Sequence, residues 1–110
     1  MTELIQQATE DILRVCQPHR IILFAEKRTM ATGKLKALSL CVIVPDGTDC
    51  RHLRTQLHLA LSADIPVNLS VYTAEEWDDL LEDETSYAAW IARKGQVIYE
   101  QKKYFICKRL

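Results

Sequence analysis

Two short apolar runs separated by a charged segment constrain the fold of this 110-residue chain most strongly. The runs occupy residues 21–25 and 38–44, and the charged segment between them occupies residues 26–36. Short runs rich in isoleucine, leucine and valine are typical of buried strands, because a buried helix needs a longer stretch. The sequence therefore predicts two core strands at 20–25 and 37–44, joined by an exposed basic loop.

An amphipathic helix is predicted before the first strand, with Thr2 as its N-cap and an end before Pro18. Apolar residues recur there at helical spacing, and Asp11 and Arg14 fall between them on the expected polar side. A second helix is predicted after the turn at 45–47, with either Thr48 or Asp49 as its N-cap. Its leucines recur at helical spacing and are expected to face the core.

The second half of the chain predicts a strand at 67–72, where apolar and polar residues alternate. Thr73 and Glu76 form a capping-box pattern that opens a helix, and a further helix is expected to end at Gly95 in a left-handed conformation. The helical spacing of Trp77, Tyr87 and Trp90 predicts that all three pack in the core. A short strand at 97–99 and a basic tail at 101–110 complete the chain.

The expected element order is α-β-β-α-β-α-α-β followed by the tail. This order predicts an α/β (α+β) fold with a small mixed sheet flanked by helices. No internal repeat or linker divides the sequence, so residues 1–110 are expected to form a single domain.

Composition and charge limit the classes of function. The net charge of −1 argues against nucleic-acid binding, because proteins that bind nucleic acids usually carry a strong excess of basic residues. No apolar run approaches the roughly 20 residues needed to cross a bilayer, so we expect a cytoplasmic protein with no membrane partner. Its cysteines, at 16, 41, 50 and 107, lack metal-site spacing, which predicts reduced structural residues and no metal centre.

The order and spacing of these segments resemble a known family. The features are the first strand at 21–24, the polar loop, the second strand, a helix, and the strand that begins at Pro66. The closing stretches at 72–77 and 90–100 add to the likeness. Over about residues 20–100, the chain resembles the small nucleotidyltransferase domains of the DNA polymerase β superfamily.

The resemblance implies where a catalytic site would lie and that its chemistry is missing. The family's phosphate-binding Gly-Ser pair matches Ala25 and Glu26, and its two metal-binding aspartates match Ala37 and Ser39. The third carboxylate matches Asn68. Members of the family use Mg²⁺ and a nucleotide, but a hydroxyl and an amide supply no charge to hold a divalent cation. The resemblance therefore implies a catalytically degenerate member with no expected cofactor.

Three hypotheses about function follow. The first is association with a protein partner or as a homodimer, because small members of this superfamily are often encoded beside an all-helical protein as toxin–antitoxin pairs. The tail, with Tyr104, Phe105 and Ile106 among basic residues, is a candidate segment for such association.

The second hypothesis is a regulatory nucleotide- or phosphate-binding module. Its candidate ligands are the basic residues of the loop, Lys27, Arg28, Lys34 and Lys36, although clustered lysines are also typical of a solvated loop. The third is an active nucleotidyltransferase that draws replacement carboxylates from Glu26 or Asp46.

Overall fold

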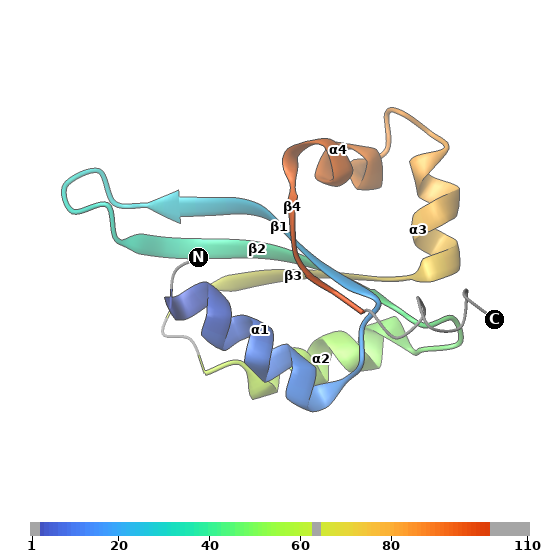
Figure 1. Cartoon of the computed structure of the whole chain (residues 1–110), viewed down its shortest axis with the longest axis horizontal. Helices are drawn as coiled ribbons and strands as arrows, with labels where there is room; N and C mark the ends of the chain where they lie inside the picture. Colours follow the sequence, from blue (N-terminus) through green and yellow to red (C-terminus); the bar gives the residue numbers. More distant parts are fainter. Residues whose placement is uncertain (1–2, 63–64, 102–110) are drawn as a thin grey trace.

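The computed structural model of the chain describes residues 3–62 and 65–101. Eight elements follow one another in this part of the chain: α1 (Glu3–Val15), β1 (Arg20–Arg28), β2 (Leu35–Val44), α2 (Cys50–Ala60), β3 (Val67–Thr73), α3 (Ala74–Leu81), α4 (Tyr87–Lys94) and β4 (Gln96–Glu100) (Figure 1). This order confirms the predicted α/β fold and its sequence of elements. The tail lies outside the described residues from position 102 onward.

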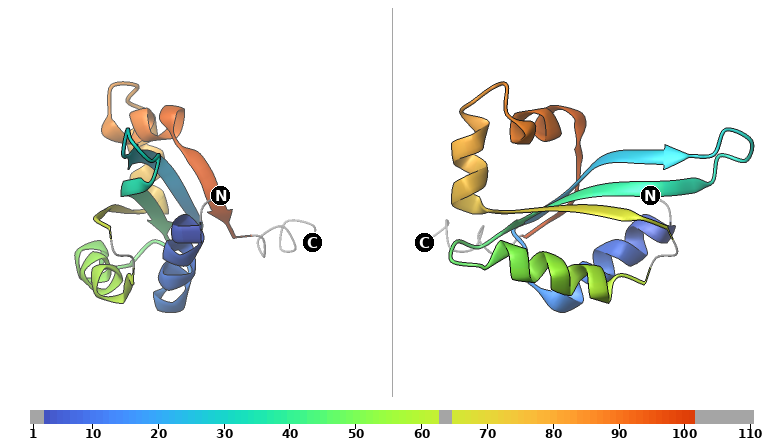
Figure 2. Two further views of the ribbon diagram at one scale, coloured as in Figure 1. Left: turned by 90° about the vertical axis from the view of Figure 1, so that its left-hand side faces the viewer. Right: turned by 180° about the vertical axis from the view of Figure 1, so that it is seen from behind.

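The four strands form one mixed sheet in the order β3-β2-β1-β4. β1 runs antiparallel to both β2 and β4, whereas β2 and β3 are parallel. Helices α1 and α2 cover one face of the sheet, and α3 and α4 lie on the other (Figures 1 and 2). The predicted small sheet with flanking helices is therefore confirmed.

Each face of the sheet carries its own hydrophobic cluster, because successive side chains of a strand point to opposite faces. On the α1/α2 face, Leu40 and Val42 of β2 are fully buried. On the α3/α4 face, Cys41 and Ile43 pack in one cluster with Trp77 of α3. The long apolar run of β2 is thus explained by burial on both sides.

The predicted basic loop is shorter than expected, because β1 continues to Arg28 and β2 begins at Leu35. Lys27 pairs with Ala37 in the extended ladder. The connection is closed by a hydrogen bond from Thr29 N to Lys34 O and contains Gly33 at φ 71°. The two strands project beyond the helices as a hairpin (Figures 1 and 2).

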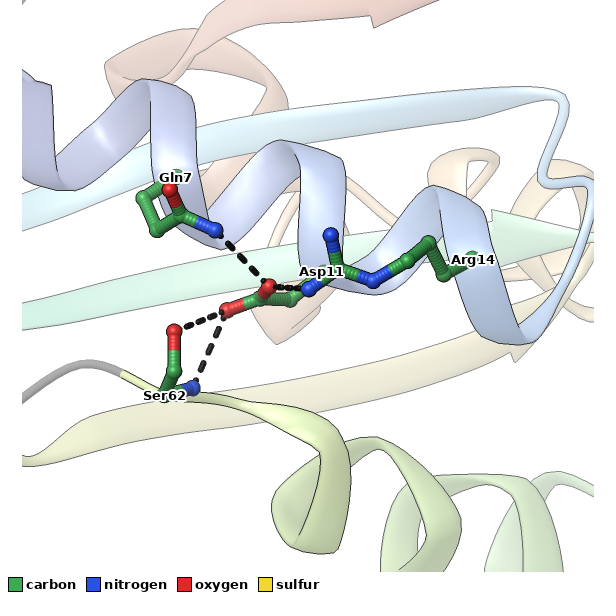
Figure 3. A network of polar contacts seen from close by, with 4 residues as sticks. All are labelled: Gln7, Asp11, Arg14 and Ser62. Carbon is green, nitrogen blue, oxygen red and sulfur yellow. Dashed lines mark hydrogen bonds and ion pairs between the residues drawn. The ribbon is translucent and has the colours of Figure 1, made fainter.

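Asp11 joins α1 to the end of α2, although the sequence predicted an exposed position (Figure 3). Its side chain is fully buried. One carboxylate oxygen accepts hydrogen bonds from Gln7 Nε2 at 3.0 Å and from the Arg14 guanidinium. The other accepts from Ser62, through the main-chain N at 3.0 Å and through Oγ at 2.9 Å.

These bonds decide the protonation state of Asp11. Burial alone raises the pKa of a carboxyl group because it disfavours the charged form. Here the hydrogen bonds from Ser62 and Gln7 and the charge of Arg14 together outweigh burial, and the pKa of Asp11 falls below its ordinary value of 3.8. Asp11 is therefore a charged group that stabilises the contact between two segments far apart in the sequence.

Gly95 ends α4, as predicted, but its conformation differs from the prediction. Its φ of −85° and ψ of 165° are extended backbone, so the expectation of a left-handed cap is wrong. A Cβ at this position would lie 2.3 Å from Ile22 Cγ2 and 2.7 Å from Ile91 O. Glycine is required here by close approach to β1 rather than by a positive φ.

Two helix caps follow the predictions. Asp49 is the N-cap of α2, where its side chain accepts from His52 N at 3.1 Å. Thr73 and Glu76 form the predicted capping box at the start of α3. Within the described residues, no helix is long and apolar enough to span a membrane.

Candidate functional site

Ala25, Ser39 and Asn68 lie side by side on three adjacent strands. Ala25 of β1 pairs with Ser39 of β2, and Ser39 pairs in turn with Asn68 of β3. The Nδ2 atom of Asn68 lies 3.5 Å from Ser39 Oγ. Positions that the resemblance assigns to a phosphate-binding residue and two carboxylates are thus neighbours. We call these three residues the central row.

The central row faces the same side of the sheet as α3 and α4. Cys41 and Ile43 belong to the cluster on that face, and Ser39 and Ala37 precede them at alternating positions of β2. Ala25 and Asn68 are exposed, and Ser39 is half-buried. The row therefore offers one hydroxyl and one amide to solvent, and both of these groups are uncharged.

Neither of the alternative carboxylates lies beside this row. Glu26 pairs with Leu38, so it faces the α1/α2 side, and its Oε1 lies 3.4 Å from Arg28 Nε. Asp46 lies beyond the end of β2, where its side chain accepts from Glu75 N at 2.8 Å. From Ser39 to the end of β2 the strand rises by about 17 Å, at about 3.3 Å per residue. The geometry thus gives no support to an active site built from these two groups.

The four basic residues predicted to bind phosphate do not converge on one point. Arg28 is used within the hairpin, where it donates to Gly33 O at 3.0 Å as well as approaching Glu26. Lys27 and Arg28 face opposite sides of the sheet, because consecutive strand residues alternate. Lys34 lies in the turn, and Lys36 lies at a register shift in β2. Of the four, Lys27 shares the face of the central row.

Beside the row, an aromatic cluster joins β1 to α4. Phe24 is buried, and its ring centroid lies 5.9 Å from that of Tyr87 and 6.0 Å from that of Trp90, both edge-on. Tyr87 and Trp90 stack on each other at 5.7 Å. A register shift between Leu23 and Ala25 accompanies this arrangement in β1.

The outer members of this cluster are exposed, in contrast to the prediction that they pack in the core. Trp77 is 4% exposed and fits the prediction, whereas Tyr87 is 54% exposed and Trp90 is 38% exposed. The signal that sequence analysis missed is the small buried face of α4, which consists of Ala88, Ala89 and Ile91. A helix that packs through two alanines and one isoleucine leaves its large aromatic residues at the surface.

Arg93 and Lys94 continue this exposed side of α4, because residues three and four positions apart neighbour each other on a helix. Both side chains are exposed. We call Tyr87, Trp90, Arg93 and Lys94 the α4 stripe. It combines two large apolar rings with two positive charges.

The remaining candidates for chemistry lie apart from one another. Among residues 3–62 and 65–101, no three His, Cys, Asp or Glu side chains are grouped as they would be around a metal ion. His52 and His58 are exposed on α2. Burial raises the pKa of the Cys41 thiol to about 12, so this side chain behaves as a small apolar residue.

Comparison of this chain with protein-family models, curated proteins and solved structures gives no match.

Proposed function

We propose that this chain is a nucleotidyltransferase-like domain that has lost catalysis and acts by binding a protein partner. The central row supports the first half of the proposal. Ser39 and Asn68, two of the three positions that the resemblance matches to carboxylates, are neighbours on adjacent strands and carry no charge. Two-metal phosphoryl transfer needs negatively charged ligands at such positions, and neutral groups do not supply them.

The α4 stripe supports the second half. Tyr87 and Trp90 form an exposed stacked pair, and the buried ring of Phe24 packs edge-on against Tyr87. Large aromatic residues and arginine are enriched among the residues that dominate binding energy at protein interfaces. A preformed stack also loses little side-chain freedom when a partner binds. These features make the stripe the binding surface of the proposal, and they are the observation that carries it.

The chemistry of the stripe specifies the partner. Its aromatic rings are complementary to the apolar face of a helix. The positive charges of Arg93 and Lys94 are complementary to acidic residues beside that face. Lys27 adds a further positive charge on the same face of the sheet. An amphipathic acidic helix of another protein is therefore the proposed occupant, in line with the helical partner that the resemblance implies.

A capture experiment with matched variants tests the proposal. The tagged chain is incubated with extract from cells that naturally express it, in parallel with the double variant Tyr87→Ala, Trp90→Ala and with Leu59→Ala. Leu59 is a suitable control because it is 83% exposed on α2, on the other side of the sheet. Each truncated hot-spot residue costs about 2 kcal/mol of binding, so the double variant is expected to lose the partner.

The outcomes distinguish a helical protein partner from a second copy of the chain. A helical partner that is retained by Leu59→Ala and lost by the double variant supports the proposal. Loss with both variants, or with neither, contradicts the assignment to the α4 stripe. Self-association that Tyr87→Ala, Trp90→Ala abolishes in sedimentation would identify a second copy of the chain as the occupant, and it would overturn the acidic-helix partner.

The regulatory nucleotide-binding alternative makes a different prediction. It requires Lys27 and Arg28 to hold phosphate, so replacing both by alanine would abolish ATP binding. The engagement of Arg28 with Glu26 and Gly33 favours a structural role for that residue instead. We therefore expect the double variant to affect hairpin stability rather than any nucleotide affinity.

A further inference from the structure

A cavity of about 200 Å³ lies where the start of β1 meets β2 and the first turns of α3. Six residues line it: His19, Arg20, Ile43, Ala74, Trp77 and Asp78. It is separate from the central row, because Ile43 lies four residues beyond Ser39 on β2. The volume corresponds to about seven water molecules at their liquid density.

Two buried donors without acceptors belong to residues of this one cavity. In the described part of the chain, the buried side-chain nitrogen or oxygen atoms that lack a hydrogen-bond partner are Arg20 Nε and Trp77 Nε1. Trp77 is 96% buried, as its exposed fraction of 4% shows. Because native proteins satisfy most buried donors, two such groups at a single cavity require an explanation.

We infer that the cavity binds a small free amino acid, whose carboxylate accepts hydrogen bonds from Arg20 Nε–H and Trp77 Nε1–H. A carboxylate has two acceptor oxygens, so it satisfies both donors at once. The charge of Arg20 strengthens one of these bonds.

Asp78 decides between an amino acid and a simple anion. Its carboxylate also lines the cavity, next to Trp77 in the chain. Within the described residues it has no hydrogen-bond or ion-pair partner. A multiply charged anion such as phosphate would be repelled by Asp78, whereas the ammonium group of an amino acid is attracted to it. Ile43 and Ala74 supply the apolar wall for a small side chain.

The donors are held in place before any ligand arrives. Arg20 Nη2 lies 3.2 Å from Glu100 Oε2, which fixes one side of the guanidinium and leaves Nε–H free. The main chain beside it is anchored by His19 N to Ile43 O at 2.7 Å and by Gln101 N to His19 O at 2.9 Å. A site whose groups are already ordered loses less entropy on binding. This inference does not depend on the proposed association of the α4 stripe.

An NMR titration tests the site through the indole N–H signals of the two tryptophans. The uniformly labelled protein is titrated with glycine, alanine, serine and valine, and in parallel with propionate and ethylamine. A saturable shift of the Trp77 signal with an amino acid is expected, while the Trp90 signal stays in place. The Trp90 indole is an internal control, because it does not line the cavity.

Two exposed neighbours on α3 provide matched variants. Asp78→Asn removes the charge that faces the cavity and is expected to weaken binding about tenfold or more, which corresponds to about 1.4 kcal/mol. Asp79→Asn makes the same change one residue further along and is expected to leave the affinity within about twofold. Trp77→Phe, which deletes the indole donor and keeps an aromatic ring, is expected to abolish binding, as measured through the main-chain amide signals of Ile43 and Ala74 at the cavity.

Three results would overturn the inference. The first is the absence of a saturable shift of the Trp77 signal with any amino acid up to about 10 mM. A dissociation constant above this concentration would mean negligible affinity. The second is equal binding of propionate and alanine, which would remove the role of Asp78. The third is an equal effect of Asp78→Asn and Asp79→Asn.

Discussion

Asn68 Nδ2 and Ser39 Oγ lie 3.5 Å apart on parallel neighbouring strands, with Ala25 as the next residue across the sheet. This contact joins positions that are 29 residues apart in the chain. The proposed function relies on this contact, because the resemblance matches both positions to carboxylates of the family. The contact consists of a hydroxyl and an amide, and both of these groups are uncharged.

Restoring the carboxylates is expected to restore cation binding. In the triple variant Ala37→Asp, Ser39→Asp, Asn68→Asp, three carboxylates would share one face of β2 and β3, where oxygen ligands suit Mg²⁺ and Mn²⁺. Electron paramagnetic resonance is expected to detect Mn²⁺ bound to this variant at micromolar to millimolar concentrations. The control Ala37→Asn, Ser39→Asn introduces amides of similar size and is expected to bind no more Mn²⁺ than the unchanged protein. Equal binding by all three proteins would contradict the assigned positions.

Replacing Asp11 is expected to destabilise the fold by about 2–3 kcal/mol, because removing a buried charged acceptor leaves its donors unpaired. Asp11→Asn is the suitable change, since it keeps the shape of the side chain. Urea denaturation monitored by circular dichroism measures the loss. Glu10→Gln, at an exposed neighbouring position of α1, is the control and is expected to lie within about 0.5 kcal/mol of the unchanged protein.

The same residue predicts a pH dependence. The folded-state pKa of Asp11 is lowered below its ordinary value of 3.8, so the unfolded state binds the proton more tightly. The stability that Asp11 contributes is therefore fully present above about pH 5 and is lost as the pH falls through the lowered pKa. The difference in unfolding free energy between the unchanged protein and Asp11→Asn is expected to shrink below about pH 4. A difference that grows on acidification would contradict this assignment.

Gly95→Ala is expected to be more destabilising than Gly47→Ala. The added Cβ at position 95 meets Ile22 and the carbonyl oxygen of Ile91, and such overpacking costs about 1–3 kcal/mol. At Gly47, with φ 87°, the space is open, so the change is expected to cost about 1 kcal/mol through backbone strain alone. Thermal unfolding of both variants gives the comparison, and the reverse order would contradict the close packing of Gly95 on β1.

Removing one charge from the α4 stripe is expected to weaken partner binding and reduce its dependence on salt. Lys94→Gln keeps a long polar side chain but removes its positive charge. The variant therefore loses an electrostatic attraction to the acidic helix, and salt screens that attraction in the unchanged protein. Binding is expected to weaken about threefold to fivefold at low salt and to differ little at about 1 M salt. Lys34→Gln, in the hairpin turn, is the matched control. An unchanged salt dependence in Lys94→Gln would contradict the proposed charge complementarity.

Apolar periodicity is the part of the fold that the sequence predicts well. The apolar run at 38–44 and the alternation at 67–72 identify β2 and β3. Burial of a strand on one or two faces determines the spacing of apolar residues within its own sequence, so the strand can be recognised without distant contacts. The capping box of Thr73 and Glu76 is predictable for the same reason, since its two partners are only three residues apart in the sequence. These local rules are sufficient for the element order and hence for the fold class.

The features that local patterns do not predict depend on contacts between distant residues. Asp11 is buried because Ser62 supplies two donors from 51 positions away. The requirement for Gly95 arises from Ile22, on another strand. The hairpin extends through charged residues because β1 and β2 pair with each other there, although no apolar alternation marks the pairing. Exposure of Tyr87 and Trp90 likewise depends on the tertiary contacts of α4.

An NMR titration with ATP, with and without Mg²⁺, tests the central claim that the row of Ala25, Ser39 and Asn68 has lost its catalytic chemistry. We expect no Mg²⁺-dependent shift of the Ser39 and Asn68 signals at millimolar ATP and no transfer of labelled nucleotide. Shifts at these residues that require Mg²⁺, accompanied by transfer, would contradict it.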